Sequence, residues 1–302
     1  MLNRFMTYSL KLSPQVTAIL QALFVTFLWS TSWVLIKFGL EAIPPLTFAG
    51  LRYMLAFLCL LPLVFLPATL EPLRRLGRPG WGSLLFLGLL FYTVTQGSQF
   101  LALAYLPAVT TSLLLNFTTV VVALMGIALL AERPTRFQWA GVLINIGGIL
   151  LYFYPVDLPA GQLFGIIVAL VGVLANASSS ILGRQVNRAG TISPLAVTVV
   201  SMGVGAGLLL ATGIAIQGFP ALSLTSWLIV GWLAVVNTAY AFTLWNQTLR
   251  TLSAVESSII NSTMLIQIAV LAWVFLGERL NWQEVFGMVL AGVGVMMVQL
   301  RK

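Results

Sequence analysis

The sequence predicts an all-α integral membrane protein with ten transmembrane helices, arranged as two inverted five-helix repeats. Three observations predict this class. First, 60% of the 302 residues are hydrophobic and 7% are charged, whereas soluble proteins average about 25% charged residues. Second, ten apolar segments are each long enough to cross a bilayer, which takes about 20 residues. Third, the chain resembles itself at an offset of 146 residues.

Each predicted span is an apolar segment of 19 or more residues, and most connections between the spans contain proline or glycine. Because the bilayer core offers the backbone no hydrogen-bond partners, segments of this length are expected to be helices. The connection at residues 67–81 is expected to be the longest loop. The predicted spans are about residues 15–38, 45–66, 82–104, 108–130, 137–155, 161–183, 194–216, 222–247, 254–276 and 282–300.

The distribution of basic residues predicts the orientation of these spans. An even number of spans places both termini on one side of the membrane. Twelve Lys and Arg residues flank the spans on that side, and two flank them on the other. Cytoplasmic loops are the ones enriched in Lys and Arg, so both termini are predicted to be cytoplasmic. The net charge of +8 is therefore attributed to membrane topology, and no nucleic-acid partner is expected.

Composition excludes several kinds of chemical site. The chain contains no histidine and a single cysteine, Cys59. It therefore cannot form a His-ligated metal centre, a Ser–His catalytic pair or an internal disulfide. No Asp or Glu lies near the middle of a predicted span, so paired catalytic carboxylates within the membrane are not expected either. We therefore expect no enzyme activity, no metal site and no cofactor.

An internal duplication underlies the predicted arrangement. Residues 106–152 align without gaps on residues 252–298, with ten identical pairs. The most specific match is that of Glu132–Arg133 with Glu278–Arg279, because each dipeptide follows a long span. The expected organisation is a cytoplasmic N-terminal segment at residues 1–14, a first repeat at residues 15–155 and a second repeat at residues 161–300.

A repeat of five spans has a consequence for function. Because five is an odd number, the second copy must cross the membrane in the opposite direction. Many secondary transporters have such inverted repeats, bind their substrate between the halves near the bilayer midplane, and expose it to each side in turn. The alternative is a duplicated scaffold without transport activity.

A family resemblance is carried by residues in the first span and by the segments that follow the fourth and ninth spans. Together these residues resemble the drug/metabolite transporter superfamily, EamA type, and the resemblance covers essentially the whole chain. The motifs are Trp29-Ser30-Thr31-Ser32-Trp33 with Lys37, Ala131-Glu132-Arg133-Pro134 with Gly141, Gly147 and Gly148, and Gly277-Glu278-Arg279-Leu280 with Gly287, Gly292 and Gly294.

This resemblance implies a bacterial inner-membrane exporter of small metabolites, built from two five-helix halves. Within the superfamily, the chain is most similar to the aromatic amino acid exporters. The second half departs from the first-helix pattern, since Asn176 to Ser180 replace the Trp-rich run. The two halves therefore need not contribute equally to the substrate site.

Polar and aromatic residues within the spans are the candidates for substrate binding. Amides and hydroxyls are costly to expose to lipid, so they are expected to face the interior. With Trp and Tyr rings they predict a cavity for a small zwitterionic or uncharged metabolite. The alternatives are interhelical hydrogen bonds for the polar residues and interfacial anchoring for the tryptophans. The candidates are Trp29, Ser32, Trp33, Tyr92, Gln96, Gln99, Asn116, Asn176, Ser179, Asn237, Tyr240, Trp245, Asn246, Ser258 and Asn261.

Helical spacing groups some of these candidates. In a regular α-helix, Tyr92, Gln96 and Gln99 share one face. Asn237 and Tyr240 are likewise expected to share a face of the eighth span. Since these two spans are related by the repeat, their polar faces are expected to meet between the halves.

Arg52 is the one charged residue well inside a predicted span. It is the eighth residue of its span, about 10 Å below the outer end at the rise of an α-helix. Charged groups in hydrocarbon are costly and tend to be functional, so Arg52 is a candidate contact for a substrate carboxylate. The alternative is that its side chain snorkels outward to the interface or pairs with a helix C-terminus.

The expected function is export of small organic metabolites by alternating access, with aromatic or other neutral amino acids as substrates. The alternatives are another metabolite or drug class in the same superfamily, or a membrane scaffold or receptor. The short predicted loops argue against a receptor. The expected partners are a small-molecule substrate and the lipid bilayer, and the protein is expected to be a monomer or a weak homodimer.

Overall fold

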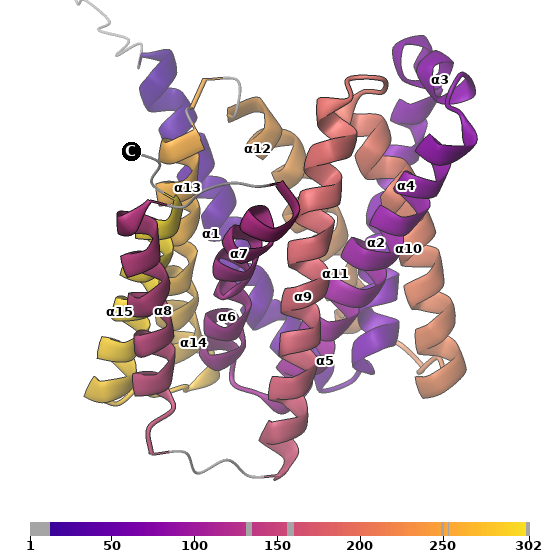
Figure 1. The fold of residues 1–302 in the computed structure, drawn as a ribbon. Coiled ribbons are helices and arrows are strands. Elements are labelled where there is room, and N and C mark those ends of the chain that lie inside the picture. Colours follow the sequence, from indigo (N-terminus) through magenta and orange to yellow (C-terminus); the bar gives the residue numbers. More distant parts are fainter. Residues whose placement is uncertain (1–12, 131–134, 156–159, 249–250, 253, 300–302) are drawn as a thin grey trace, which may run out of the picture.

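The computed structural model describes residues 13–130, 135–155, 160–248, 251–252 and 254–299 (Figure 1). All regular secondary structure in this part of the chain is helical. Within it, nine helical spans of at least 18 residues have the composition of a membrane span. A tenth, α8, has 17 residues, and spans range from about 17 to 25 residues. The described chain therefore confirms the predicted class, a multi-pass membrane protein built from helices.

The helices follow the predicted spans closely. The first half contains α1 (Pro14–Leu40), α2 (Pro45–Leu60), η1 (Leu61–Phe65), α3 (Pro67–Arg74), α4 (Arg78–Gly88), η2 (Leu89–Thr95), α5 (Gln96–Tyr105), α6 (Ala108–Asn116), α7 (Thr118–Leu130) and α8 (Arg136–Tyr152). The second half contains α9 (Ala160–Arg188), α10 (Pro194–Gln217), α11 (Leu224–Ala234), η3 (Val235–Tyr240), α12 (Ala241–Thr248), α13 (Ala254–Ser262), α14 (Met264–Leu276) and α15 (Trp282–Gln299).

Proline and serine determine where several helices begin. Pro14 and Pro194 are the first residues of α1 and α10, where the missing N–H of proline costs nothing. The preceding serines cap these helices: Ser13 Oγ accepts from Val16 N at 3.3 Å, and Ser193 Oγ accepts from the backbone N–H three residues later at 3.2 Å. The same chemistry thus starts one helix in each half.

The connection that was expected to be the longest loop is mostly helical. α3 begins at Pro67 and ends at Arg74, and α4 begins at Arg78. The prolines of this segment predict a loop, because proline is common in loops and turns. Proline is compatible with the first turn of a helix, and Pro67 and Pro79 occupy that position in α3 and α4.

The helices of the two halves correspond at a constant offset. α4 begins at residue 78 and α11 at residue 224, α6 at residue 108 and α13 at residue 254, and α8 at residue 136 and α15 at residue 282. Each pair is separated by 146 residues, the offset of the sequence repeat. The duplication is therefore preserved element by element.

The last helices of the two halves, α8 and α15, pack against each other and run antiparallel. A Cβ on Gly141 would lie 2.8 Å from Gly294 O, and a Cβ on Gly148 would lie 2.6 Å from Gly287 O. Asn145, between these glycines, donates from Nδ2 to Ala291 O at 2.9 Å. Because equivalent helices point in opposite directions, the second half is an inverted copy of the first.

Within the described chain, two pairs of spans that the repeat relates are interrupted along their length. η2 and η3 are π-helical and begin at Leu89 and Val235. The fourth and ninth spans are divided at Phe117 and Thr263, between α6 and α7 and between α13 and α14. π-helical turns and broken helices often adjoin functional sites in membrane transporters, so these four spans are candidates for lining such a site.

The two halves interlock in the bundle (Figure 1). α8 packs with α15 at one side, and α2 packs with α10 toward the other. α1 of the first half packs on α12 and α14 of the second, while α9 of the second half packs on α5 and α7 of the first. Helices of both halves therefore pack against each other throughout this arrangement.

Candidate functional site

A layer of buried polar side chains lies where α2, η2, α5 and η3 meet. Tyr53 on α2 donates from its Oη to Gln96 Oε1 on α5 at 2.6 Å. Tyr92 on η2 packs against the ring of Tyr53, with centroids 5.6 Å apart. All three side chains are buried. Tyr92 and Gln96, which helical spacing placed on one face, are therefore both in contact with Tyr53.

Arg52 joins this buried layer from α2. Its Nε donates to Thr238 Oγ1 on η3 at 3.1 Å. Its guanidinium lies over the rings of Tyr53 and Phe100, 5.2 and 5.9 Å from their centroids. Arg52 is 5% exposed, so it does not snorkel to the interface. Since α2 belongs to the first half and η3 to the second, this contact joins the halves.

The π-helical geometry of η3 determines how Thr238 meets Arg52. Thr238 Oγ1 donates to Leu233 O, five residues earlier, at 2.8 Å. Thr95 Oγ1 in η2 makes the same kind of bond to Leu90 O at 2.8 Å. Because the hydroxyl hydrogen of Thr238 is used in this bond, its oxygen faces Arg52 as an acceptor.

The neighbouring Asn237 ties η3 to α1. Its Nδ2 donates to Ser32 Oγ at 2.9 Å and to Thr31 Oγ1 at 3.2 Å, and it also contacts Leu28 O. Asn237 is fully buried, and its Oδ1 has no hydrogen-bond partner among the described residues. The predicted residues Ser32 and Asn237 thus meet in an interhelical hydrogen bond.

Trp29 on α1 belongs to an aromatic cluster with α12. Its ring centroid lies 5.3 Å from that of Phe242 and 5.2 Å from that of Trp245. Trp29 Nε1 is buried and unpartnered within the described chain, so this ring is not an interfacial anchor with a hydrated N–H. Trp33 is 8% exposed and packs in the main hydrophobic core. Trp29 and Trp245 are therefore brought together inside the bundle.

Other candidates make hydrogen bonds away from the layer around Arg52. Asn116 Nδ2 donates to Ser112 O one turn earlier at 2.8 Å. Ser179 Oγ donates to Asn176 O at 2.8 Å, and Asn176 Nδ2 lies 3.5 Å from a threonine hydroxyl on α7. Gln99 is half-buried. These contacts lie within α6, within α9 and between α9 and α7, and none of them involves the layer around Arg52.

Tyr240 and Asn261 are exposed, in contrast to the expectation that they face the interior. Tyr240 is 51% exposed, whereas Asn237 is fully buried. The shared face expected for these two residues assumed α-helical spacing, but Val235–Tyr240 is π-helical. A π turn contains more residues than an α turn, so the spacing no longer holds. The side chains of Asn246 and Ser258 lie outside the described part of the structure.

Tyr53 and Thr238 are not among the candidate residues that the sequence indicates. Each adjoins a residue that was singled out, Arg52 in one case and Asn237 in the other. That adjacency was the available signal, because a lone Tyr or Thr is unremarkable in an apolar span. The π-helical turn that directs Thr238 toward Arg52 leaves no trace in the hydropathy pattern.

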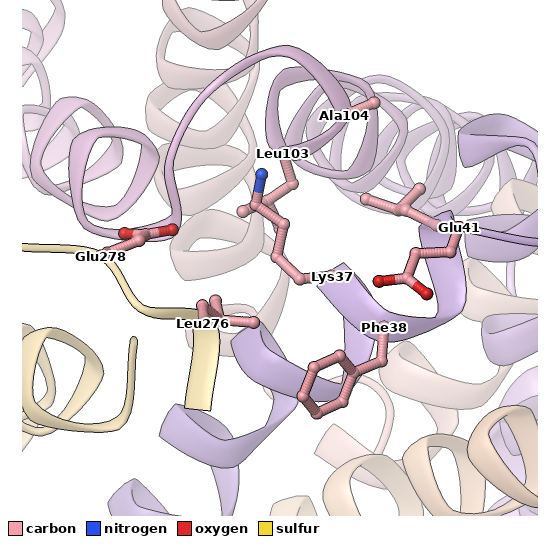
Figure 2. A pocket seen from close by; sticks show the side chains of 8 residues that line it. Lys37, Phe38, Glu41, Leu103, Ala104, Leu276 and Glu278 are labelled. Carbon is pink, nitrogen blue, oxygen red and sulfur yellow. The ribbon is translucent and has the colours of Figure 1, made fainter. Parts of the chain in front are cut away.

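A cavity of about 370 Å³ lies at the end of the bundle where α1 ends. Glu278, which follows α14, accepts hydrogen bonds from Ala108 N at 2.6 Å and Val109 N at 3.1 Å, and so caps α6 of the other half. Lys37 Nζ donates to Leu106 O at 2.7 Å. Figure 2 shows Lys37 and Glu278 extending toward this cavity from different elements. Its lining residues are Lys37, Phe38, Leu40, Glu41, Leu103, Ala104, Leu276 and Glu278.

The repeat counterpart of Glu278 is Glu132, which lies outside the described residues. A second cavity, of about 580 Å³, lies at the opposite end of α2, between α2, α10 and α12. Arg52 lies midway along α2, which begins at Pro45, just after the residues of α1 that line the first cavity, and ends at Leu60, which lines the second. Residues lining the second cavity are Leu60, Ser193, Pro194, Leu195, Thr198, Phe242, Thr243 and Gln247.

Comparison with known proteins shows the family. The model of the EamA-like transporter family matches residues 16–154 and again residues 163–300. The chain belongs to this family. The two matches fall on the two halves that the inverted repeat relates, and they confirm the EamA-type resemblance of the sequence motifs.

Two similar proteins have informative names. The uncharacterized inner membrane transporter YedA of Escherichia coli (strain K12) is 29% identical over 247 residues, which are 79% of this chain and 76% of that protein. A probable amino-acid metabolite efflux pump of Escherichia coli (strain K12) is 25% identical over 289 residues, 91% of this chain and 92% of that protein. These relatives and the family make the chain a membrane transporter, without distinguishing the aromatic amino acid exporters from other members.

A solved crystal structure has the same fold. It superposes on 93% of this chain and 97% of its own with a TM-score of 0.64, at 17% sequence identity. At this level of identity the likeness concerns the fold alone.

Proposed function

We propose that the protein exports small organic metabolites across a bacterial inner membrane by alternating access. Its substrates under this proposal are amino acids with aromatic or other neutral side chains, and both of its termini are cytoplasmic. The twelve basic residues on the side of the termini, against two on the other, support this orientation.

The observation that carries the proposal is the buried layer between two inverted halves. The contact between Arg52 and Thr238 joins the halves, and a cavity lies toward each end of α2. Rocking of inverted halves around such a layer opens it to one side at a time. The contact of Glu278 with the start of α6 joins the halves at one end and would have to break when that end opens.

The chemistry of the interior supports the substrate class. Trp29 and Trp245 offer aromatic surface, and Gln96 and Tyr92 offer neutral polar groups. Apolar rings with a few placed polar groups are typical of sites for small metabolites. The name of the similar amino-acid metabolite efflux pump agrees with this class.

Flux measurements in proteoliposomes test the proposal. Vesicles loaded with radiolabelled phenylalanine or leucine should release them faster with the protein than without it. Gln96→Ala should reduce this flux about fivefold, the effect of about 1 kcal/mol from one lost hydrogen bond. Gln185→Ala, at an exposed position of α9, is the matched control and should leave the flux unchanged. Absence of protein-dependent flux for every amino acid would refute the amino-acid assignment.

A second candidate function is export of another metabolite or drug class by the same mechanism. A similar protein, the inner membrane transporter YedA of Escherichia coli, is named without a substrate, and this favours keeping the wider class. A growth assay separates the two functions. Cells that express the protein are challenged with toxic amino acid analogues and with unrelated drugs, and the proposed function requires protection against the analogues.

A further inference from the structure

We propose that Arg52 binds the carboxylate of the transported molecule. This assigns the buried layer to small monocarboxylates, zwitterionic amino acids among them, that carry one carboxylate on a mainly apolar body. The inference rests on the transport function proposed above and narrows its substrates to one chemical class.

Among the described residues, no acidic side chain lies on α2 or on the main segments packed against it. The segments packed against α2 include α5, α10, α11 and η3. None of these segments contains Asp or Glu, and α2 contains none either. Within the described chain, the hydrogen bond that Arg52 makes is the one from Nε to the neutral hydroxyl of Thr238. A guanidinium has five N–H donors, so four of them are left for another acceptor.

A buried cation without a counter-charge is energetically unfavourable. Burial removes its hydration, and the loss is recovered only when an anion or several acceptors surround the charge. The rings of Tyr53 and Phe100 provide partial compensation through cation–π interaction. An anion carried by the transported molecule would supply the rest of this compensation. It would do so inside the membrane, where ionic contacts are strong.

The donors near Arg52 match a carboxylate in shape. The planar guanidinium presents parallel N–H groups that pair with both oxygens of a carboxylate. Gln96 uses Oε1 to accept from Tyr53, and this orientation leaves its Nε2 as a second donor in the same layer. The rings of Tyr53, Tyr92 and Phe100 border these donors and suit an apolar body on the bound molecule.

The charge balance restricts the site to one carboxylate. α10 packs on α2 as its counterpart in the second half, and it contains neither Lys nor Arg. A single cation neutralises a single carboxylate. A dicarboxylate or a phosphate dianion would leave negative charge uncompensated in the membrane, which is unfavourable.

A binding experiment with matched acids and amides tests this inference. Full-length protein in lipid nanodiscs is unfolded thermally at increasing concentrations of L-phenylalanine, L-leucine or 3-phenylpropionate, each compared with its primary amide. The concentration dependence of the unfolding temperature reports affinity. R52Q and R52M remove the charge, and R184Q removes an exposed arginine of α9 as the matched control.

We expect at least one of the acids to bind about 10- to 100-fold more tightly than its amide, as for a hydrogen bond to a charged group. R52Q and R52M should lose this preference, and R184Q should keep it. Equal affinities of acid and amide for the wild-type protein would overturn the inference, as would an unchanged preference in R52Q. If neither Arg52 variant folds, the comparison of acids with amides in the wild-type protein still decides.

Flux assays distinguish failure of this inference from failure of the proposed function. Protein-dependent export of phenylalanine and of its amide at equal rates would leave a transporter without a carboxylate site at Arg52. Absence of protein-dependent flux for acids and amides alike would instead remove the proposed amino-acid export itself.

Discussion

The contact between α8 and α15 is close enough for one methyl group to disrupt it. A Cβ on Gly148 would lie 2.4 Å from Ala291 N and 2.6 Å from Gly287 O. Both are backbone atoms of the facing helix, so they cannot rotate out of the way. Carbon atoms in ordinary contact lie about 3.5–4.0 Å from their neighbours, so the helices would have to separate locally by about 1 Å.

We therefore expect Gly148→Ala to lower the free energy of unfolding by about 1–3 kcal/mol, the usual cost of adding a methylene to a packed contact. The adjacent Gly147→Ala is the matched control. A Cβ on Gly147 meets no atom within 4 Å, and alanine is preferred over glycine in helices by up to about 1 kcal/mol. The control should therefore be neutral or slightly stabilising.

Thermal unfolding in nanodiscs, followed by tryptophan fluorescence, measures the difference between the two variants. By the symmetry of the repeat, Gly294→Ala should resemble Gly148→Ala, since its Cβ would lie 2.4 Å from Asn145 N and 2.6 Å from Gly141 O. Equal unfolding temperatures for Gly148→Ala and Gly147→Ala would refute the close antiparallel packing of α8 and α15.

Three further predictions concern the site, the cap and the orientation. Tyr53→Phe removes the hydrogen bond to α5 and should reduce amino acid flux in proteoliposomes about fivefold. The control variant Tyr240→Phe should leave the flux unchanged. Equal fluxes in the two variants would contradict a role for the buried layer. Glu278→Gln weakens the cap of α6 and should lower the free energy of unfolding by about 1 kcal/mol. The control variant Glu41→Gln should not lower it. An equal effect of the two variants would argue against the cap. Glu41 and Thr191 lie in corresponding loops of the two repeats. In a cysteine-free background, Glu41→Cys and Thr191→Cys should react with impermeant thiol reagents from opposite faces of the membrane. Reaction of both from the same face would rule out the inverted topology.

Most of the fold was predictable because it depends on averages along the chain. Ten apolar segments of sufficient length must be helical in a bilayer, and α1, α2 and α10 begin within a residue or two of their predicted positions. The start of α4 was predicted at residue 82 and lies at Arg78. Its first turn contains Arg78 and Pro79, which lowers the local hydropathy without preventing a helix.

The candidate site was predictable only in part. Gln96 and Tyr92 were singled out because amides and hydroxyls in a span are expected to face inward, and both are buried. Tyr240 was grouped with Asn237 on the same reasoning, and it is half exposed. The difference lies in η3, since a π-helical turn changes the direction of every later side chain relative to an α-helix.

The sequence by itself determined the helical membrane class, the 146-residue duplication and the inversion that follows from an odd number of spans per repeat. These are consequences of composition, length and repetition, which a one-dimensional pattern contains in full. Only the tertiary structure decided that Arg52 meets Thr238 across the two halves and that Trp29 meets Trp245. Spans that are apolar on all sides carry no periodic signal for the face they present, so the partners of each side chain are set by how the halves pack.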